Sequence, residues 1–310
     1  MKLAALVALL CAGCPKGSDN KKTIEPQVGS SLGGDAGREL LPNDAAGSAA
    51  IALPPVHPLP EVPLGLPPLP ADVTPSPEAL ALGELVAWDG RLASDGKTAC
   101  TTCHDPAHGY ASITGPGDHK RLAWPLANAA WRSRTIATDL PAHATAVLGN
   151  DLAAAADRLN QVPLYAAHLA RIGGAPADAL ARALTSYVWT RYDGDAPWDR
   201  QERLAPANDP VATGYKIFTG KAQCAQCHTP PLYSDLRPHG GYPTPSLRGA
   251  AVRPAYFHDA SATSLAQALD QHPATEMKKV ALTAPEKAAL TELLRALSAT
   301  APAPAKPVLP

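Results

Sequence analysis

The sequence lacks a charge excess of either sign. It contains 27 Lys and Arg residues against 28 Asp and Glu residues, which gives a formal net charge of −1. Proteins that bind nucleic acid or an acidic membrane surface usually present a basic patch or stripe. We therefore expect no nucleic acid among the partners. The 310 residues are enough for two modest domains, each with a hydrophobic core.

An apolar run long enough to span a bilayer is also missing at the N-terminus. The run over residues 3–10 is far shorter than the roughly 20 residues that a membrane-spanning helix needs. It follows a lysine and ends in Cys11-Ala12-Gly13-Cys14, which resembles a bacterial lipobox except that Cys11 stands where Leu is usual. We expect a signal peptide over 1–14, a lipid on Cys14, and a location on the periplasmic side of a bacterial membrane. An ordinary secretory signal cleaved nearby is the alternative.

Sustained alternation of β-branched and polar residues, the pattern of half-buried strands, does not occur. Helix signals are present instead. Ser76-Pro77-Glu78 begins a segment with apolar residues at helical spacing, and Thr283 with Glu286 forms a capping box ahead of a second one. The predicted fold class is therefore mainly α, with long ordered loops between short helices.

Low-complexity stretches flank the predicted folded part. Residues 15–75 are dominated by Gly, Ala, Ser and Pro, and such a stretch buries too little to offset its ordering entropy, so we predict a disordered tether. A coarse internal repeat, a short helix followed by a cysteine pair, divides the rest into lobes over 76–205 and 206–300. Residues 301–310 form an Ala/Pro tail.

Two of the three cysteine pairs are followed directly by histidine. Cys-x-x-Cys-His is the attachment motif of c-type haem, because two thiols at this spacing bond one porphyrin and the next residue ligates its iron. The pair at Cys11 and Cys14 is followed by Pro15 in place of histidine, so it is not a haem attachment motif. We predict two covalent haems c in two cytochrome-c-like lobes. The residues that would hold them are Cys100, Cys103 and His104 in the first lobe and Cys224, Cys227 and His228 in the second.

Two other interpretations of the cysteines remain open at this point. The four could together form a structural zinc site, or they could form disulfides in an oxidising compartment. Neither explains why histidine follows each pair.

The amino-acid sequence around both motifs resembles that of the bacterial di-haem cytochrome c peroxidase and MauG family. The first match is Trp88-Asp89-Gly90-Arg91 leading into the first motif. The second half matches over residues 218–235, at Pro245-Ser246-Leu247-Arg248-Gly249 and at Ala255-Tyr256-Phe257-His258-Asp259. The resemblance runs from about 77 to 299.

This resemblance implies a periplasmic oxidoreductase. The haem on His104 would react with hydrogen peroxide, and the haem on His228 would pass on electrons from a small periplasmic electron donor. Two alternatives are a non-enzymatic di-haem electron-transfer protein and a MauG-like oxidase that modifies a partner protein.

The first lobe departs from the family where catalysis takes place. Relatives carry a Gln and a Glu that manages protons, and aligning on Asn150 puts His143 and Ala153 in their places. We therefore expect slow peroxidase turnover. His143 is the candidate catalytic residue, as a replacement acid–base group, or it ligates the iron and closes the site.

The resemblance also suggests the remaining site residues. Counting the family's distance from Ala255 puts the distal ligand of the second haem at His272, with Met277 as the alternative ligand, or with His272 as a plain charge at a helix end. Arg91 and Arg248 lie inside family motifs and are candidates for the haem propionates.

A calcium ion is not expected. The positions of the family's calcium ligands hold Leu122, Arg253 and Ala255, and a guanidinium at an oxygen-lined site would repel a hard cation.

If haem is attached through both motifs, the denatured protein will retain two haems per chain, and Cys100→Ala or Cys224→Ala will each weaken one linkage. Haem stain and mass spectrometry of the denatured chain measure this. A single haem, or zinc in its place, would contradict the assignment.

Overall fold

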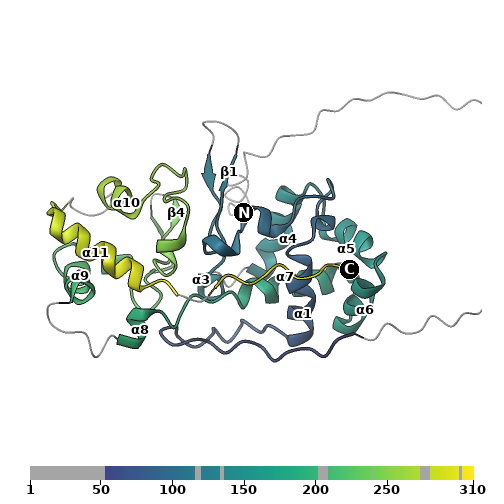
Figure 1. The fold of residues 1–310 in the computed structure, drawn as a ribbon. Helices are drawn as coiled ribbons and strands as arrows, with labels where there is room; N and C mark the ends of the chain where they lie inside the picture. The colour runs from purple at the N-terminus through teal and green to yellow at the C-terminus, as the bar shows by residue number, and fades with distance from the viewer. Residues whose placement is uncertain are drawn as a thin grey trace, which may run out of the picture.

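The protein is described by a computed structural model over residues 53–115, 120–132, 136–201, 209–239, 241–272, 280–299 and 302–310. Across these ranges the fold is mainly helical, and two lobes of helices lie side by side (Figure 1). The predicted signal peptide over 1–14, with its lipid-bearing Cys14, and the alternative ligand Met277 lie outside the described residues. Within them, a helix with the length and apolar character of a bilayer span is absent.

The first lobe packs its longer helices around a single core. These helices are α1 (Pro77–Val86), α4 (Ile136–Leu148), α5 (Leu152–Asn160), α6 (Pro163–Ile172) and α7 (Pro176–Trp189), with the short α2 (Cys100–Cys103) and α3 (Ala129–Arg132) at the edge. Leu82, Leu159 and Leu180 are completely buried in this core. The predicted start of α1 is confirmed, since the Ser76 side chain caps it and Pro77 is its first residue.

The second lobe contains fewer helices. They are α8 (Pro197–Gln201), α9 (Pro210–Thr219), α10 (Leu265–Gln271) and α11 (Ala284–Ala296). Phe218 and Leu293 form its core, and Trp198 packs with them although the predicted boundary places it in the first lobe. The capping box of Thr283 and Glu286 is confirmed at the start of α11.

Strand structure among the described residues is limited to two small hairpins. In one, β1 (Ile113–Thr114) pairs antiparallel with β2 (Arg121–Leu122), and Ile113 lies opposite Leu122. In the other, β3 (Pro238–His239) pairs antiparallel with β4 (Tyr242–Pro243). Single-turn 3-10 helices cover Gly90–Leu92, Pro106–His108, Cys224–Gln226 and Ala250–Val252.

Both lobes use a glycine to bring their main helices together. Gly83 of α1 faces the backbone carbonyl of Ala183 in α7, and Gly214 of α9 faces that of Ala289 in α11, so that a Cβ on either glycine would collide with backbone. Each glycine lies in the helix that precedes a cysteine pair. The close crossing therefore sets where each Cys-x-x-Cys-His segment emerges.

The predicted tether requires a correction over its last part. Val62, Leu66, Leu69 and the buried Val73 pack against an aromatic cluster of the folded body. Backbone carbonyls of this stretch also accept hydrogen bonds from both lobes (Trp131 Nε1 to Pro68 O, 3.0 Å; Arg248 Nη2 to Gly65 O, 2.6 Å). The stretch has no core of its own, but its scattered Leu and Val side chains gain burial by covering aromatic rings.

Arg248 is tied into a buried ion pair. Its Nη1 and Nη2 donate to the two carboxylate oxygens of Asp199, both at 2.8 Å, and the side chains are 1% and 4% exposed. A third bond runs from Nε to Pro231 O at 2.8 Å. A bidentate pair without solvent fixes α8 against the loop that follows the second cysteine pair.

Asp199→Asn should lower the free energy of unfolding by about 3–5 kcal/mol, because it leaves the Arg248 guanidinium buried without its counter-charge. The matched control is Asp195→Asn, which breaks an exposed ion pair with Arg200 (Asp195 45% and Arg200 59% exposed) and should cost far less, because solvent screens exposed pairs. Urea denaturation of the haem-loaded protein measures both. Equal costs would show that the buried pair contributes no more than the exposed one.

Candidate metal centres

The two Cys-x-x-Cys-His segments form the same tight turn. In the first, the His104 amide donates to Cys100 O at 2.9 Å, and in the second the His228 amide donates to Cys224 O at 2.8 Å. The turn brings the two thiols and the imidazole of each segment to one side. This is the arrangement that one porphyrin and its iron require.

Each proximal imidazole is oriented by a tyrosine carbonyl. The Nδ1 atom of His104 lies 3.1 Å from Tyr110 O, and that of His228 lies 3.1 Å from Tyr233 O. A carbonyl only accepts, so Nδ1 carries the proton and Nε2 is left bare for a metal. Tyr110 and Tyr233 both have left-handed backbone (φ 60° and 53°), a conformation that turns the carbonyl back toward the histidine at the cost of some strain.

A second histidine faces each proximal histidine. The ring centroids of His104 and His143 are 6.2 Å apart, and those of His228 and His272 are 6.1 Å apart. A metal held between two imidazole nitrogens, about 2 Å from each, would separate the ring centroids by about 6 Å. Both pairs therefore fit an iron between the rings. His143 comes from α4 and His272 from the end of α10.

The protonation of these rings also suits metal binding. Burial, together with the charge of the facing histidine, lowers the pKa of His104 and of His228 to about 4. Burial also lowers the pKa of His143 and His272. All four imidazoles are therefore neutral at pH 7, which is the form that ligates a metal.

The zinc and disulfide interpretations do not fit the structure. Cys100, Cys103, Cys224 and Cys227 are all free thiols. Among the described residues, the group of potential ligands that lies together is Cys227, Asp235 and His239, which contains one cysteine of one pair. A four-cysteine zinc site would need both pairs within reach of one ion.

The main influences on the pKa of His104 come from groups other than carboxylates. Among the described residues, the groups that shift the pKa of His104 are His143, Arg132 and two backbone carbonyls. Ala153, where the resemblance puts a Glu in relatives, is exposed on α5. His143 is thus the polar side chain that faces His104.

The two arginines that the sequence suggests for propionates are occupied by protein carboxylates. Arg91 contacts both oxygens of Asp89 through Nε and Nη2, and Tyr165 Oη donates to the same carboxylate at 2.6 Å. Arg248 is held by Asp199. These pairs use the Nε and Nη2 donors of Arg91 and both Nη donors of Arg248, which favours a structural role for the two residues, and their assignment to propionates stays a prediction.

Three aromatic residues near the boundary between the lobes, Trp189, Tyr192 and Trp198, separate into two groups. Trp189 and Tyr192 pack around Trp131, whereas Trp198 stacks with Tyr215 in the second lobe at 4.7 Å between ring centroids. They therefore form no continuous aromatic path.

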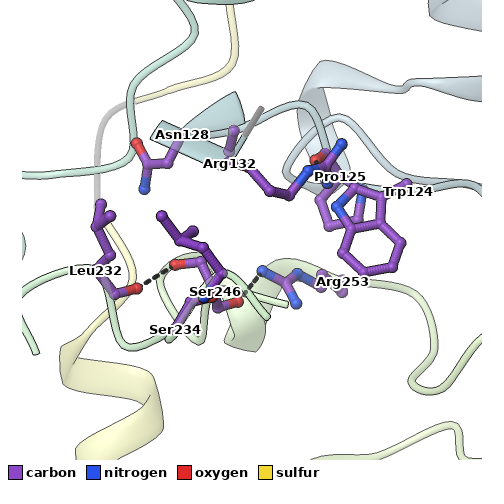
Figure 2. Close-up of a pocket in the computed structure, with 10 residues that line it drawn as sticks. Trp124, Pro125, Asn128, Arg132, Leu232, Ser234, Ser246 and Arg253 are labelled. Carbon is purple, nitrogen blue, oxygen red and sulfur yellow. Dashed lines mark hydrogen bonds between the residues drawn. The ribbon is translucent and has the colours of Figure 1, made fainter. Parts of the chain in front are cut away.

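Sequence reasoning missed the tyrosine carbonyls and a pocket between the lobes. The signal for the first was available, since Tyr110 and Tyr233 follow the motif histidines by six and five positions. The pocket is lined by Trp124 and Arg132 from the first lobe and by Ser246 and Arg253 from the second (Figure 2).

Comparisons with known proteins agree with this geometry. Residues 77–204 match the protein family described as di-haem cytochrome c peroxidase. The chain is 34% identical over 216 residues to cytochrome-c peroxidase IdrP1 of Denitromonas iodatirespirans, covering 62% of this chain and 56% of that protein. It is 28% identical over 291 residues to the methylamine utilization protein MauG of Methylorubrum extorquens, covering 76% of this chain and 82% of MauG.

Solved structures share the fold. A MauG-like protein associated with microbial copper homeostasis has a TM-score of 0.62 at 20% identity, covering 80% of this chain and 95% of that one. The diheme peroxidase BthA from Burkholderia thailandensis has a TM-score of 0.59 at 17% identity, covering 83% and 98%. The matched region thus spans most of these two structures but little more than half of IdrP1.

Proposed function

This chain belongs to the di-haem cytochrome c peroxidase and MauG family, and we propose that it is a periplasmic di-haem c oxidoreductase of this type. The observation that carries the proposal is the pair of facing imidazoles above each Cys-x-x-Cys-His turn, at 6.2 and 6.1 Å. The substrate would be hydrogen peroxide, with electrons from a small periplasmic donor. The location and the lipid anchor rest on the sequence of residues 1–14.

Each lobe supplies every protein group that a covalent haem needs. The thiols of Cys100 and Cys103, or of Cys224 and Cys227, would form the thioether bonds. His104 and His228 would be the proximal ligands, with their Nδ1 protons fixed by the tyrosine carbonyls. Haem iron supplies one-electron redox chemistry, together with a peroxide-binding position wherever one of its coordination positions is open.

His272 is the proposed distal ligand of the second lobe. It is the C-cap residue of α10, and its ring lies opposite His228 with Phe257 at 6.3 Å. Two imidazoles without a thioether favour a low reduction potential. An electron-transfer centre with both axial positions filled suits the role that the resemblance implies for this lobe.

His143 is the proposed distal ligand of the first lobe, and this decides how the enzyme would work. As long as its ring stays opposite His104, it holds the position that peroxide needs. Turnover therefore requires α4 to withdraw the His143 ring, after which the same imidazole is free to accept or donate a proton. We also propose that no calcium ion takes part.

A second candidate function is electron transfer without catalysis. The facing of His143 and His104 favours it, because the spacing is nearly the same as in the second lobe. If His143 never leaves its position, both sites are closed and the chain can only pass electrons between redox partners.

Ligand variants of the haem-loaded protein test the assignment. His272→Ala and His143→Ala should each convert one haem from low to high spin, since each opens one axial position. The control His108→Ala removes an exposed histidine paired with Asp105 and should leave both spectra unchanged. A Met–iron charge-transfer band that disappears in Met277→Ala would instead assign the second distal ligand to Met277.

Peroxide reactivity separates the two functions. Wild-type turnover with small electron donors should be slow, and Ala153→Glu should raise it, since a general acid–base group is typically worth about 10²–10⁴-fold. Stopped-flow spectra of oxidised and half-reduced protein with peroxide measure the reaction. Wild-type spectra that stay unchanged in both states, while those of His143→Ala respond to peroxide, would favour the electron-transfer function, whereas fast wild-type turnover would show that another group already manages the protons.

A further inference from the structure

A pocket between the two lobes contains two arginine side chains. Trp124, Asn128 and Arg132 line it from the first lobe, and Ser234, Ser246 and Arg253 line it from the second (Figure 2). The guanidinium groups are close enough for the charge of Arg253 to lower the pKa of Arg132.

The arginines occupy equivalent places in a nine-residue repeat, residues 124–132 and 245–253. A residue with left-handed backbone lies at its centre in both copies, Asn128 with φ 59° and Gly249 with φ 68°. A short helix follows each of them. The four identities are Leu126 with Leu247, Ala129 with Ala250, Ala130 with Ala251, and Arg132 with Arg253.

Both arginines are fixed by the same kind of contact. Arg132 Nη1 donates to Pro125 O at 3.2 Å, and Arg253 Nη2 donates to Ser246 O at 2.6 Å. In each case the carbonyl lies seven residues earlier, at the second position of the repeat. Arg253 also donates to Arg248 O, and Arg132 stacks over the Trp124 ring at 4.5 Å. The repeat therefore builds one arginine from each lobe into the same pocket.

The start of each repeat copy contacts a proximal histidine. Backbone groups of Trp124 and Pro245 interact with the rings of His104 and His228, respectively. The charge of Arg132 also reaches His104 and contributes to its lowered pKa. The pocket thus borders both candidate haem sites.

Among the described residues, the pocket brings together two guanidinium groups and one nearby carboxylate, that of Asp193. Among the described residues no carboxylate forms an ion pair with Arg132 or Arg253. Asp193 is the acidic group that acts on Arg253; it forms no ion pair with Arg253, and its Oδ1 accepts from the Ala299 amide at 2.9 Å. The Nε atom of Arg253 is buried without a hydrogen-bond partner. Burial lowers the pKa of Arg132 to about 9 and of Arg253 to about 10. Charges that lose contact with solvent are normally paired, and one carboxylate does not balance two guanidinium groups, so the pocket suits an anionic ligand.

We propose that Arg132 and Arg253 together bind haem propionate carboxylates, one haem from each lobe, so that the two haems share one electrostatic site. The inference rests on the proposed function, since it requires a haem in each lobe. A guanidinium binds a carboxylate with matched geometry. This proposal takes the place of the sequence-based prediction that Arg91 and Arg248 bind the propionates, because the side chains of those two arginines contact Asp89 and Asp199.

If the two arginines share the propionates, their charges should influence the reduction potentials of both haems. A fixed positive charge beside a haem stabilises its reduced form, and its removal leaves the propionate uncompensated, so the potential falls. Because each guanidinium lies near the other, the loss of one arginine should affect both haems.

Spectroelectrochemical titration of the haem-loaded protein tests this. Arg132→Gln and Arg253→Gln should each lower both midpoint potentials, and the double variant should lower them further. Arg253→Lys retains the charge and should stay closer to wild type than Arg253→Gln. Arg182→Gln and Arg295→Gln, which remove exposed charges from α7 and α11, are the matched controls and should leave the potentials nearly unchanged.

Three results would overturn the proposal. One is a double variant with two bound haems and wild-type potentials. Another is an equal shift in Arg253→Lys and Arg253→Gln, which would assign the effect to the carbonyl contacts. The third is a wild-type potential that changes with acetate or phosphate at constant ionic strength, which would identify a free anion in the pocket. A chain that binds no covalent haem would instead refute the proposed function.

Discussion

Two imidazole rings held about 6 Å apart across a gap are the constraint on which each lobe depends. One ring is fixed by its position after the cysteine pair and by a tyrosine carbonyl, and the other comes from a distant element. The elements differ, because His143 lies within α4, a helix interrupted by Pro141, whereas His272 ends the short α10. The position of the ring is conserved between the lobes, but the means of holding it is not.

The lobes also differ in how far the polypeptide alone can stabilise them. The first lobe surrounds its site with five longer helices and a large apolar core, whereas the second relies mainly on α9 and α11 and on loops. A lobe with a small core depends more on a large cofactor to complete it. The short helices and long loops of the second lobe therefore fit a lobe whose core is completed by a large cofactor.

Local features of this fold, and the one histidine pairing that the family's register specifies, could be predicted from the sequence, whereas other tertiary contacts could not. The helix at Pro77, the capping box at Thr283 and the facing of His272 and His228 depend on short-range pattern or on register. The partner of Arg248 was not predictable, because Asp199 lies on α8, far from the Arg248 loop in sequence, and only folding brings the two together. The repeat that contains Arg132 was missed because its central residues differ, with Asn128 in one copy and Gly249 in the other, although both supply the same left-handed turn.

The Pro-rich stretch before α1 has a mechanical effect on the molecule. Two of its carbonyls, those of Pro68 and Gly65, accept hydrogen bonds from Trp131 in the first lobe and from Arg248 in the second. The stretch therefore links the two lobes. Relative rotation of the lobes would break these bonds and expose the apolar side chains beneath. The distance between the two centres is then set by the covalent chain and its packing. If the proposed haems occupy both lobes, an electron passing between them would need no docking motion, and its rate should be insensitive to solvent viscosity.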